Sequence, residues 1–440
     1  MRAVSIIILT LLSLGLSAQE KVKITMREAV ELGLIHNFDI KIAEEQVNLA
    51  ENNNNPGNAG FTPNITGGLN NQNQFSNNQN PASFLQGKFN LNSVAPFVQL
   101  DWVMFDGFRA WTESNRLQLL EEQSLGNTRV IVESTVQGVI LAYSFALVEQ
   151  RKVEILQETL ELSRARYQYE EEKKSLGAAT TFDLIQAKNA YLSDSSNLLL
   201  QELNFQNSLQ ELKLILGIDE DIRFYELDGN VEPGIRDYDL EFLRMEMLDN
   251  NAQMINQYIN QEILKKEVKL ARSELYPTVS MTTGVNYNWN RFNVDGQQPV
   301  SGGQTDYYIN FSLQFTLFKG TTIINQIRNA NVNERIGEIQ IDQLTQSLNV
   351  QLDKAYQTYE ARRKIVNVNQ ANVDNARLNL ELSTERFRNG TINSFNFRDV
   401  QIELLTAESR LLDSLYQLIE SEVELSRLSG EILGRIAESN

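Results

Sequence analysis

The chain contains 440 residues, with 57 acidic and 39 basic side chains, one His and no Cys. Its net charge of −18 argues against nucleic acid as a partner, because phosphate binding requires clustered basic side chains. The lack of Cys excludes disulfides, thiolate nucleophiles and iron–sulfur ligation, and the single His36 excludes most hydrolytic triads and multi-histidine metal sites. The composition therefore predicts a protein that is not an enzyme and needs neither a cofactor nor a metal.

The first residues have the pattern of an export signal. Arg2 precedes the apolar run Val4–Leu16, which is followed by the small residues Ser17 and Ala18. At about 13 residues, the run is too short to cross the roughly 30 Å hydrocarbon core of a bilayer as a helix. We therefore expect residues 1–18 to be a signal peptide, and we expect no transmembrane helix in the exported chain.

A helical stretch and a pair of alternating segments come next. Met26–Asn52 has a helical pattern, and between about residues 61 and 105 apolar residues alternate with polar ones around the amide-rich segment Asn70–Asn80. A period of two is typical of a strand with one apolar face. We expect a β-hairpin over about 61–105, with Asn70–Asn80 in a mobile external loop.

Two long helices are predicted after this hairpin. Within Val132–Tyr167, apolar residues recur at alternating steps of three and four, which is the heptad pattern of a coiled coil. No Pro occurs from Gly107 to Glu232, so nothing interrupts a helix from Gly107 to about Lys174. A turn containing Gly follows, and a second helix, Thr181–Leu216, returns.

The second half of the chain repeats this order after a linker, residues 218–240. Its predicted elements are a helical stretch (Leu240–Ser273), a hairpin (about 276–318, with the loop Asn288–Gln304), a long helix (Thr321 to about Phe387) and a returning helix (Ser394–Leu433). We therefore expect two repeats, residues 19–217 and 241–440.

Local matches support the duplication. Leu100–Gly107 aligns with Leu313–Gly320. The same spacing in sequence pairs further landmarks of the two halves: Gly177 with Gly390, Tyr143 with Tyr356, and Gly217 with Gly430, while Asn37 pairs with Asn251 one residue further on. Several landmarks at one spacing indicate an internal two-fold repeat.

The alternating segments favour membrane strands over a soluble sandwich, because their polar face is almost uncharged and aromatic residues lie near their ends. The candidate interfacial aromatics are Trp102, Tyr276, Trp289, Tyr307 and Phe318. Two hairpins give four strands, and an open four-stranded sheet in lipid would leave edge N–H and C=O groups unpaired. Because bacterial barrels have at least eight strands, we expect a barrel shared among chains, with eight, twelve or sixteen strands; we favour twelve from three chains, although this arithmetic does not decide it.

At this point the sequence resembles the TolC-like outer-membrane efflux proteins over essentially the whole exported chain. Ser273–Pro277 matches the entry to a strand, and Leu313–Gly320 with its earlier copy matches the exit into a long helix. Leu176–Ala187 and Phe387–Phe397 match the tips of the helical hairpins. The specificity comes from the order and the duplication of these motifs.

The resemblance implies a mainly α protein: a homotrimer with a long α-helical coiled-coil barrel in the periplasm and a twelve-stranded transmembrane β-barrel in outer-membrane lipid. It implies the exit duct of a tripartite efflux pump for small molecules such as drugs, with a periplasmic adaptor (membrane fusion protein) and an inner-membrane transporter as partners. Two alternatives remain open: the outer-membrane channel of type I protein secretion, and a secreted coiled-coil structural or adaptor protein that forms no channel.

The resemblance also implies roles for residues at the hairpin tips. The expected adaptor-docking residues are Gly177, Ala178, Ala179, Thr180, Gly390, Thr391, Ile392 and Asn393. Asp183 and Asp399 match positions of entrance acids, and a threefold ring of carboxylates would favour cations. Alternatively, Asp183 only complements a helix dipole and Asp399 is a solvated surface charge. The chain departs from the family where Asn396 replaces a second acid and Ile392 a basic latch residue.

Overall fold

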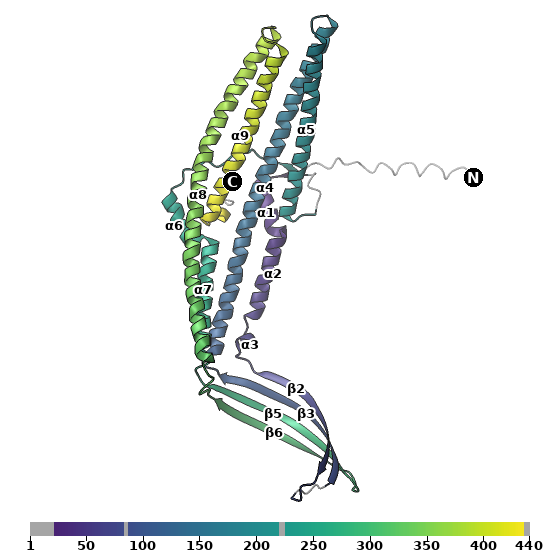
Figure 1. Ribbon diagram of the computed structural model, residues 1–440, viewed down its shortest axis with the longest axis vertical. Helices are drawn as coiled ribbons and strands as arrows, with labels where there is room; N and C mark the ends of the chain where they lie inside the picture. Colours follow the sequence, from purple (N-terminus) through teal and green to yellow (C-terminus); the bar gives the residue numbers. More distant parts are fainter. Residues whose placement is uncertain (1–21, 83–86, 220–224, 435–440) are drawn as a thin grey trace, which may run out of the picture. The chain divides into compact units, whose positions relative to one another are not determined.

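The computed structural model describes residues 22–82, 87–219 and 225–434 (Figure 1). The predicted signal peptide lies outside these residues. The chain divides into two compact units, described in turn below. Unit 1 contains Met1–Glu44, Asn127–Ile255 and Leu344–Asn440, and unit 2 contains Glu45–Gly126 and Asn256–Gln343.

The described chain is mainly helical, as predicted, and the boundary between the units falls inside four of its helices. The helices longer than one turn are α1 (Met26–His36), α2 (Phe38–Asn53), α4 (Arg109–Ser175), α5 (Thr181–Leu216), α6 (Leu240–Asn250), α7 (Ala252–Ser273), α8 (Thr322–Arg388) and α9 (Ser394–Leu428). Helices α4 and α8 have 67 residues each, roughly 100 Å at 1.5 Å per residue. Each is followed by an antiparallel partner, α5 or α9 (Figure 1).

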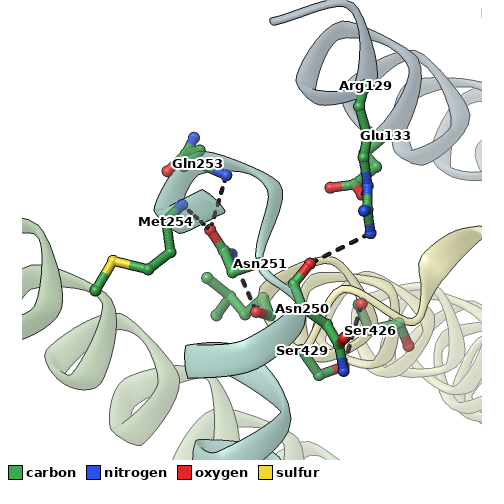
Figure 2. Close-up of polar contacts among 9 residues, drawn as sticks. Arg129, Glu133, Asn250, Asn251, Gln253, Met254, Ser426 and Ser429 are labelled. Atoms are coloured by element: carbon green, nitrogen blue, oxygen red, sulfur yellow. Dashed lines mark hydrogen bonds and ion pairs between the residues drawn. The ribbon is translucent and has the colours of Figure 1, made fainter. Parts of the chain in front are cut away.

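A buried asparagine begins α7 in unit 1 (Figure 2). The side-chain oxygen of Asn251 accepts hydrogen bonds from the backbone N–H groups of Gln253 at 3.0 Å and Met254 at 3.2 Å, and its side-chain amide donates to the Leu428 carbonyl at 3.1 Å. The side chain thus caps α7 and ties it to the end of α9. Gly430 follows with φ +78°, and a Cβ there would lie 2.5 Å from a backbone oxygen. We call Asn251, Leu428 and Gly430 the second clasp.

The same arrangement occurs at the start of α2. The side-chain oxygen of Asn37 accepts hydrogen bonds from the backbone N–H groups of Asp39 and Ile40, at 2.9 and 3.2 Å, and its side-chain amide donates to the Ile215 carbonyl at 2.8 Å. Gly217 has φ +68° and lies against the end of α1. We call Asn37, Ile215 and Gly217 the first clasp. The paired residues Asn37 and Asn251 therefore make the same hydrogen bonds in both halves.

The core of unit 1 forms where α1, α4, α5 and α9 meet. Its fully buried members include Tyr143, Leu212 and Leu216. The Tyr143 hydroxyl lies 2.6 Å from the carbonyl oxygen of Ile24 and 2.8 Å from that of Asp228, so it is anchored at the end of a short parallel sheet where both strands finish. That sheet pairs β1 (Val22–Ile24) in parallel with β4 (Tyr225–Leu227), and β4 lies inside the segment predicted as a linker. A strand of three residues is too short to show an alternating pattern in the sequence.

By length and composition alone, α4 is the one described helix that contains a stretch apolar enough to cross a membrane. The core helix of a soluble protein passes the same test. In α4, Val136, Val139 and Ala146 are buried in the core of unit 1. Packing against neighbouring helices therefore accounts for the buried part of this stretch, which is 39% of it.

Unit 2 contains a four-stranded antiparallel sheet in the order β2-β3-β5-β6. Its strands are β2 (Asn64–Asn78), β3 (Gly87–Phe105), β5 (Thr278–Val294) and β6 (Val300–Gln314), and the one-turn helix α3 (Pro56–Ala59) precedes β2. The central strands β3 and β5 join the two hairpins, so β2 and β6 are the edges (Figure 1).

Three predictions about element ends were wrong. The segments Asn70–Asn80 and Asn288–Gln304 are mostly strand rather than loop, because β2 extends to Asn78 and β5 to Val294. Amide and Gly residues on both faces hide the alternation there, while the backbone groups still pair across the sheet. Helix α9 also ends at Leu428 rather than at Leu433, because the left-handed Gly430 terminates it.

Candidate functional site

The two helical hairpins turn with the same backbone geometry. Gly177 and Gly390 have φ of +76° and +70°, in the left-handed region where Gly alone is free of Cβ strain. The N–H of Gly177 bonds to the Lys174 carbonyl at 3.0 Å and that of Ala178 to the Lys173 carbonyl at 2.8 Å. The residues after α8 repeat this pattern, with bonds of 3.0 and 2.9 Å. Both turns are Schellman motifs, in which a left-handed residue closes the helix end.

The first tip continues into a capping box at the start of α5. The Thr180 hydroxyl accepts from the Asp183 N–H at 3.2 Å, and the Asp183 carboxylate accepts from the Thr180 hydroxyl at 2.6 Å and from its N–H at 3.1 Å. Hydrogen bonds from the Thr180 side chain and backbone hold the pKa of Asp183 below its usual value. Asp183 therefore stabilises the start of α5, whatever else it does.

The second tip has an amide cap in place of the carboxylate. The Asn393 side chain accepts from the backbone N–H of Asn396 at 2.8 Å. Asp399 lies further along α9 and is exposed, and its side chain has no hydrogen bond or ion pair with another described residue. The tips also expose large apolar side chains, with Leu176 at 82%, Phe182 at 72% and Phe395 at 55%. The other predicted tip residues, Ala178, Ala179, Thr391 and Ile392, lie in the two turns.

Sequence reasoning missed a buried charge cluster that joins the two hairpins within unit 1. Asp194 of α5, which is 1% exposed, accepts hydrogen bonds from Ser163 of α4 and from the Arg398 guanidinium of α9. Arg398 also donates to the Ser163 hydroxyl at 3.3 Å. We call Ser163, Asp194 and Arg398 the buried cluster. Its members lie on three helices, so no local pattern in the sequence indicates them.

A second arginine lies beside this cluster. Arg166 of α4 is 4% exposed and donates to the Ser394 carbonyl at 3.4 Å. Burial lowers its pKa to about 10, repulsion from Arg398 adds to the effect, and attraction to Asp194 and Glu170 opposes it. The Asp194 carboxylate therefore compensates two cationic side chains at the contact between the hairpins.

The predicted interfacial aromatics have different surroundings. Trp102 of β3 donates to the Phe61 carbonyl at 3.0 Å, and Tyr276 packs edge-on against Phe108 at 6.4 Å between ring centroids. Phe318, which follows β6, is 84% exposed. Trp289 pairs with Val94 well along β5, whereas Tyr307 lies in the middle of β6 because that strand begins earlier than predicted.

Comparisons with known proteins agree with the fold. Nodulation protein T of Rhizobium leguminosarum bv. trifolii is 18% identical to this chain over 384 residues, which are 87% of this chain and 80% of that protein. The CmeC outer membrane channel of Campylobacter jejuni has a TM-score of 0.76 at 16% identity, covering 92% of this chain and 86% of the other. The open MtrE outer membrane channel of Neisseria gonorrhoeae has a TM-score of 0.69 at 13% identity, covering 95% and 94%.

The family assignment comes from a model of a whole family rather than from these individual likenesses. The model described as outer membrane efflux protein matches residues 29–218 and 243–431, one segment in each half of the chain. Together these segments cover most of the sequence. The protein therefore belongs to the outer membrane efflux protein family, the TolC-like channels, whose members transport molecules rather than catalyse reactions.

Proposed function

We propose that the chain assembles as a homotrimer into an outer-membrane channel, the passive exit duct of a tripartite efflux pump for small molecules. In this proposal a periplasmic adaptor and an inner-membrane transporter supply the cargo and the energy. The two helical hairpins of each copy contribute to the wall of a periplasmic tunnel, and the sheet contributes four strands to a shared barrel in outer-membrane lipid.

The observation that carries the proposal is the apolar face of the four-stranded sheet. Alternate residues of β6 expose large apolar side chains to an unusual degree: Tyr307 at 81%, Ile309 at 61%, Phe311 at 64% and Leu313 at 72%. A soluble protein rarely leaves so large a continuous apolar surface in water. Lipid is the solvent in which this face is stable.

The sheet edges support a barrel made from several copies. Strands β2 and β6 each have one side without a partner strand among the described residues. In hydrocarbon an unpaired edge is prohibitively costly, and bacterial barrels begin at eight strands, so one chain does not close a barrel. Pairing of β6 of one copy with β2 of the next satisfies both edges, and three copies give about twelve strands.

The hairpin tips are the proposed place of adaptor docking. Exposed Leu176, Phe182 and Phe395 offer apolar contacts beside the two turns. Asp183 and Asp399 are proposed to add negative potential at the tunnel entrance. Because the Asp183 carboxylate is held by Thr180, Asp399 is the better candidate for contact with permeating ions.

The proposal is tested by purifying the protein from outer membranes in detergent and measuring its oligomer mass and its conductance in planar bilayers. A trimer that conducts is expected. A soluble monomer or dimer without conductance would refute the proposal and favour the secreted coiled-coil protein. Cargo is tested separately: deletion of the gene is expected to raise intracellular accumulation of small-molecule dyes, whereas loss of a secreted polypeptide alone would favour protein secretion.

A further inference from the structure

The strand register divides the sheet of unit 2 into two faces. Directly paired residues share a face, so the register places Leu100, Thr283 and Ile309 in one row, and the adjacent row contains Gln99, Gly284 and Tyr308 on the opposite side. We call the first side face A and the second face B. Near the helices face A is apolar and face B is polar.

The polarity of the two faces reverses toward the hairpin turns. The last row of apolar character on face A contains Val94 and Trp289. Beyond it face A becomes polar and charged, with Asn92, Arg291, Ser301, Asn90, Asn293 and Lys88. Face B becomes apolar over the same stretch. Its residues there are Phe89, Leu91, Phe292, Val294 and Val300, which we call the apolar patch.

The reversal marks where face A stops facing lipid. A lipid-facing strand surface does not carry Arg291, Lys88 and a run of amides. Phe75 of β2 is the exception, an exposed apolar residue on face A. The described strands therefore continue beyond the lipid for about six residues, or roughly 20 Å at 3.3 Å per residue. In that stretch the apolar patch faces the lumen while face A meets water.

The charges of face B are all of one sign. Asp101 and Asp306 are its charged residues within the four described strands, whereas the basic Arg291 and Lys88 lie on face A. Neutral donors hold both carboxylates in place. Gln99 and Thr282 donate to Asp101 at 2.7 and 2.9 Å, and Gln304 donates to Asp306 at 2.6 Å. Face B thus combines acids with an apolar surface further along the same strands.

We propose that the apolar patch is a contact site for cationic amphiphiles as they leave the channel. The acids of face B, the nearer of which (Asp306) lies roughly 20 Å before the patch at 3.3 Å per residue, concentrate cations in the lumen, and the patch binds their apolar part. The inference rests on the proposed function, because it needs face B to line a lumen. It adds a substrate class and a place of contact. Cross-strand pairs Leu91–Phe292 and Phe292–Val300 make the patch continuous across three strands.

The test measures block of single trimeric channels in planar bilayers by tetraphenylphosphonium, with tetramethylammonium as a cation that lacks apolar rings. The variants are Phe292→Asn and, as a smaller change, Leu91→Asn. Phe75→Asn is the matched control, because it makes the same kind of change at the same end of the sheet on face A. Oligomer mass is measured for every variant.

Phe292→Asn is expected to raise the blocking dissociation constant of tetraphenylphosphonium about five- to tenfold, because one ring of the patch supplies part of the transfer free energy of a buried Phe. Leu91→Asn is expected to have a smaller effect in the same direction, and Phe75→Asn none. Channel block by tetramethylammonium should be the same in the unmodified protein and in all variants. Equal tetraphenylphosphonium block in all conducting channels would overturn this inference and leave the proposed function standing.

Two further outcomes also count against the contact site. Loss of the trimer in both Phe292→Asn and Leu91→Asn, with Phe75→Asn intact, would show that the patch packs against a second copy instead of cargo. Absence of conductance in the unmodified protein would overturn both the inference and the proposed function. The three negative results are therefore distinguishable from one another.

Discussion

Replacing Asp194 with Asn removes the carboxylate that compensates Arg398 and leaves a side chain of almost the same size. Asp194 is 1% exposed, and the Arg398 side chain is 16% exposed. Removing one member of a buried ion pair costs about 3–5 kcal/mol, because the remaining charge stays buried. Partial solvation of Arg398 places the expected cost near the lower limit, about 3 kcal/mol. Local opening of the hairpin contact should then become roughly 100-fold more frequent.

Hydrogen exchange of the detergent-solubilised protein measures this opening directly, because backbone amides around Ser163 and Arg398 exchange when the contact between α4, α5 and α9 breaks. Global unfolding of an oligomer depends on its concentration, so a local measurement is preferable. The matched control is Glu385→Gln. Glu385 pairs with Arg388 at the exposed surface of α8, with side chains 66% and 72% exposed, so the control should change exchange by less than about threefold.

The reasoning fails if Asp194→Asn and Glu385→Gln change exchange equally. A second variant separates the charge effect from packing: Asp194→Leu combined with Arg398→Met replaces the pair with apolar side chains of similar size. That double variant should recover most of the protection lost in Asp194→Asn, because a buried pair is often replaceable by packed apolar residues. Equal losses in the single and double variants would assign the effect to shape rather than charge.

Three further predictions concern turns, acid and ions. Gly177→Ala should lower the free energy of unfolding by about 1 kcal/mol, because residue 177 has a positive φ. Gly217→Ala should lower it by about 3 kcal/mol, because the added Cβ would also lie 2.4 Å from a backbone oxygen. Equal losses in the two variants would contradict this prediction. The pKa of Asp183 is lower in the folded than in the unfolded protein, so its contribution to stability is fully present above the unfolded-state pKa and is lost as the pH falls through the folded-state pKa. Protection of the backbone amides at the start of α5 from hydrogen exchange should therefore decrease in acid, and Thr180→Ala should remove this pH dependence. Asp399→Lys should lower cation preference in reversal-potential measurements; unchanged selectivity there and in Asp183→Lys would exclude an entrance ring.

The long helices were predictable because heptads and the absence of Pro are local signals. The predicted helix from Gly107 to about Lys174 corresponds to α4, which ends one residue later at Ser175. The spacing that pairs Gly177 with Gly390 also holds in the backbone, since both adopt positive φ. Within the long helices this sequence spacing is less exact. It pairs Tyr143 with Tyr356, but the fully buried tyrosine of α8 is Tyr359, whose hydroxyl forms hydrogen bonds with the Arg236 backbone.

The buried cluster and the reversal of the sheet faces could not be predicted, because both depend on residues far apart in the chain. Asp194 and Arg398 are separated by 204 positions, and nothing near either residue indicates that they meet in a buried site. The reversal of the two sheet faces was hidden for a related reason. Phe292 and Leu91 look like strand-end aromatics or isolated apolar residues until the register shows that they are directly paired.

The two clasps also bear on the order in which the protein folds. The first joins Asn37 to Ile215 across 178 positions, and the second joins Asn251 to Leu428 across 177. Because the entropy of loop closure depends on length, the two closures carry nearly the same cost, and each uses residues of one half alone. Pairing of β3 with β5 is different, since it needs strands from both halves. Formation of the sheet and packing of α9 against α4 and α5 are therefore the steps that make the folding of the two halves interdependent.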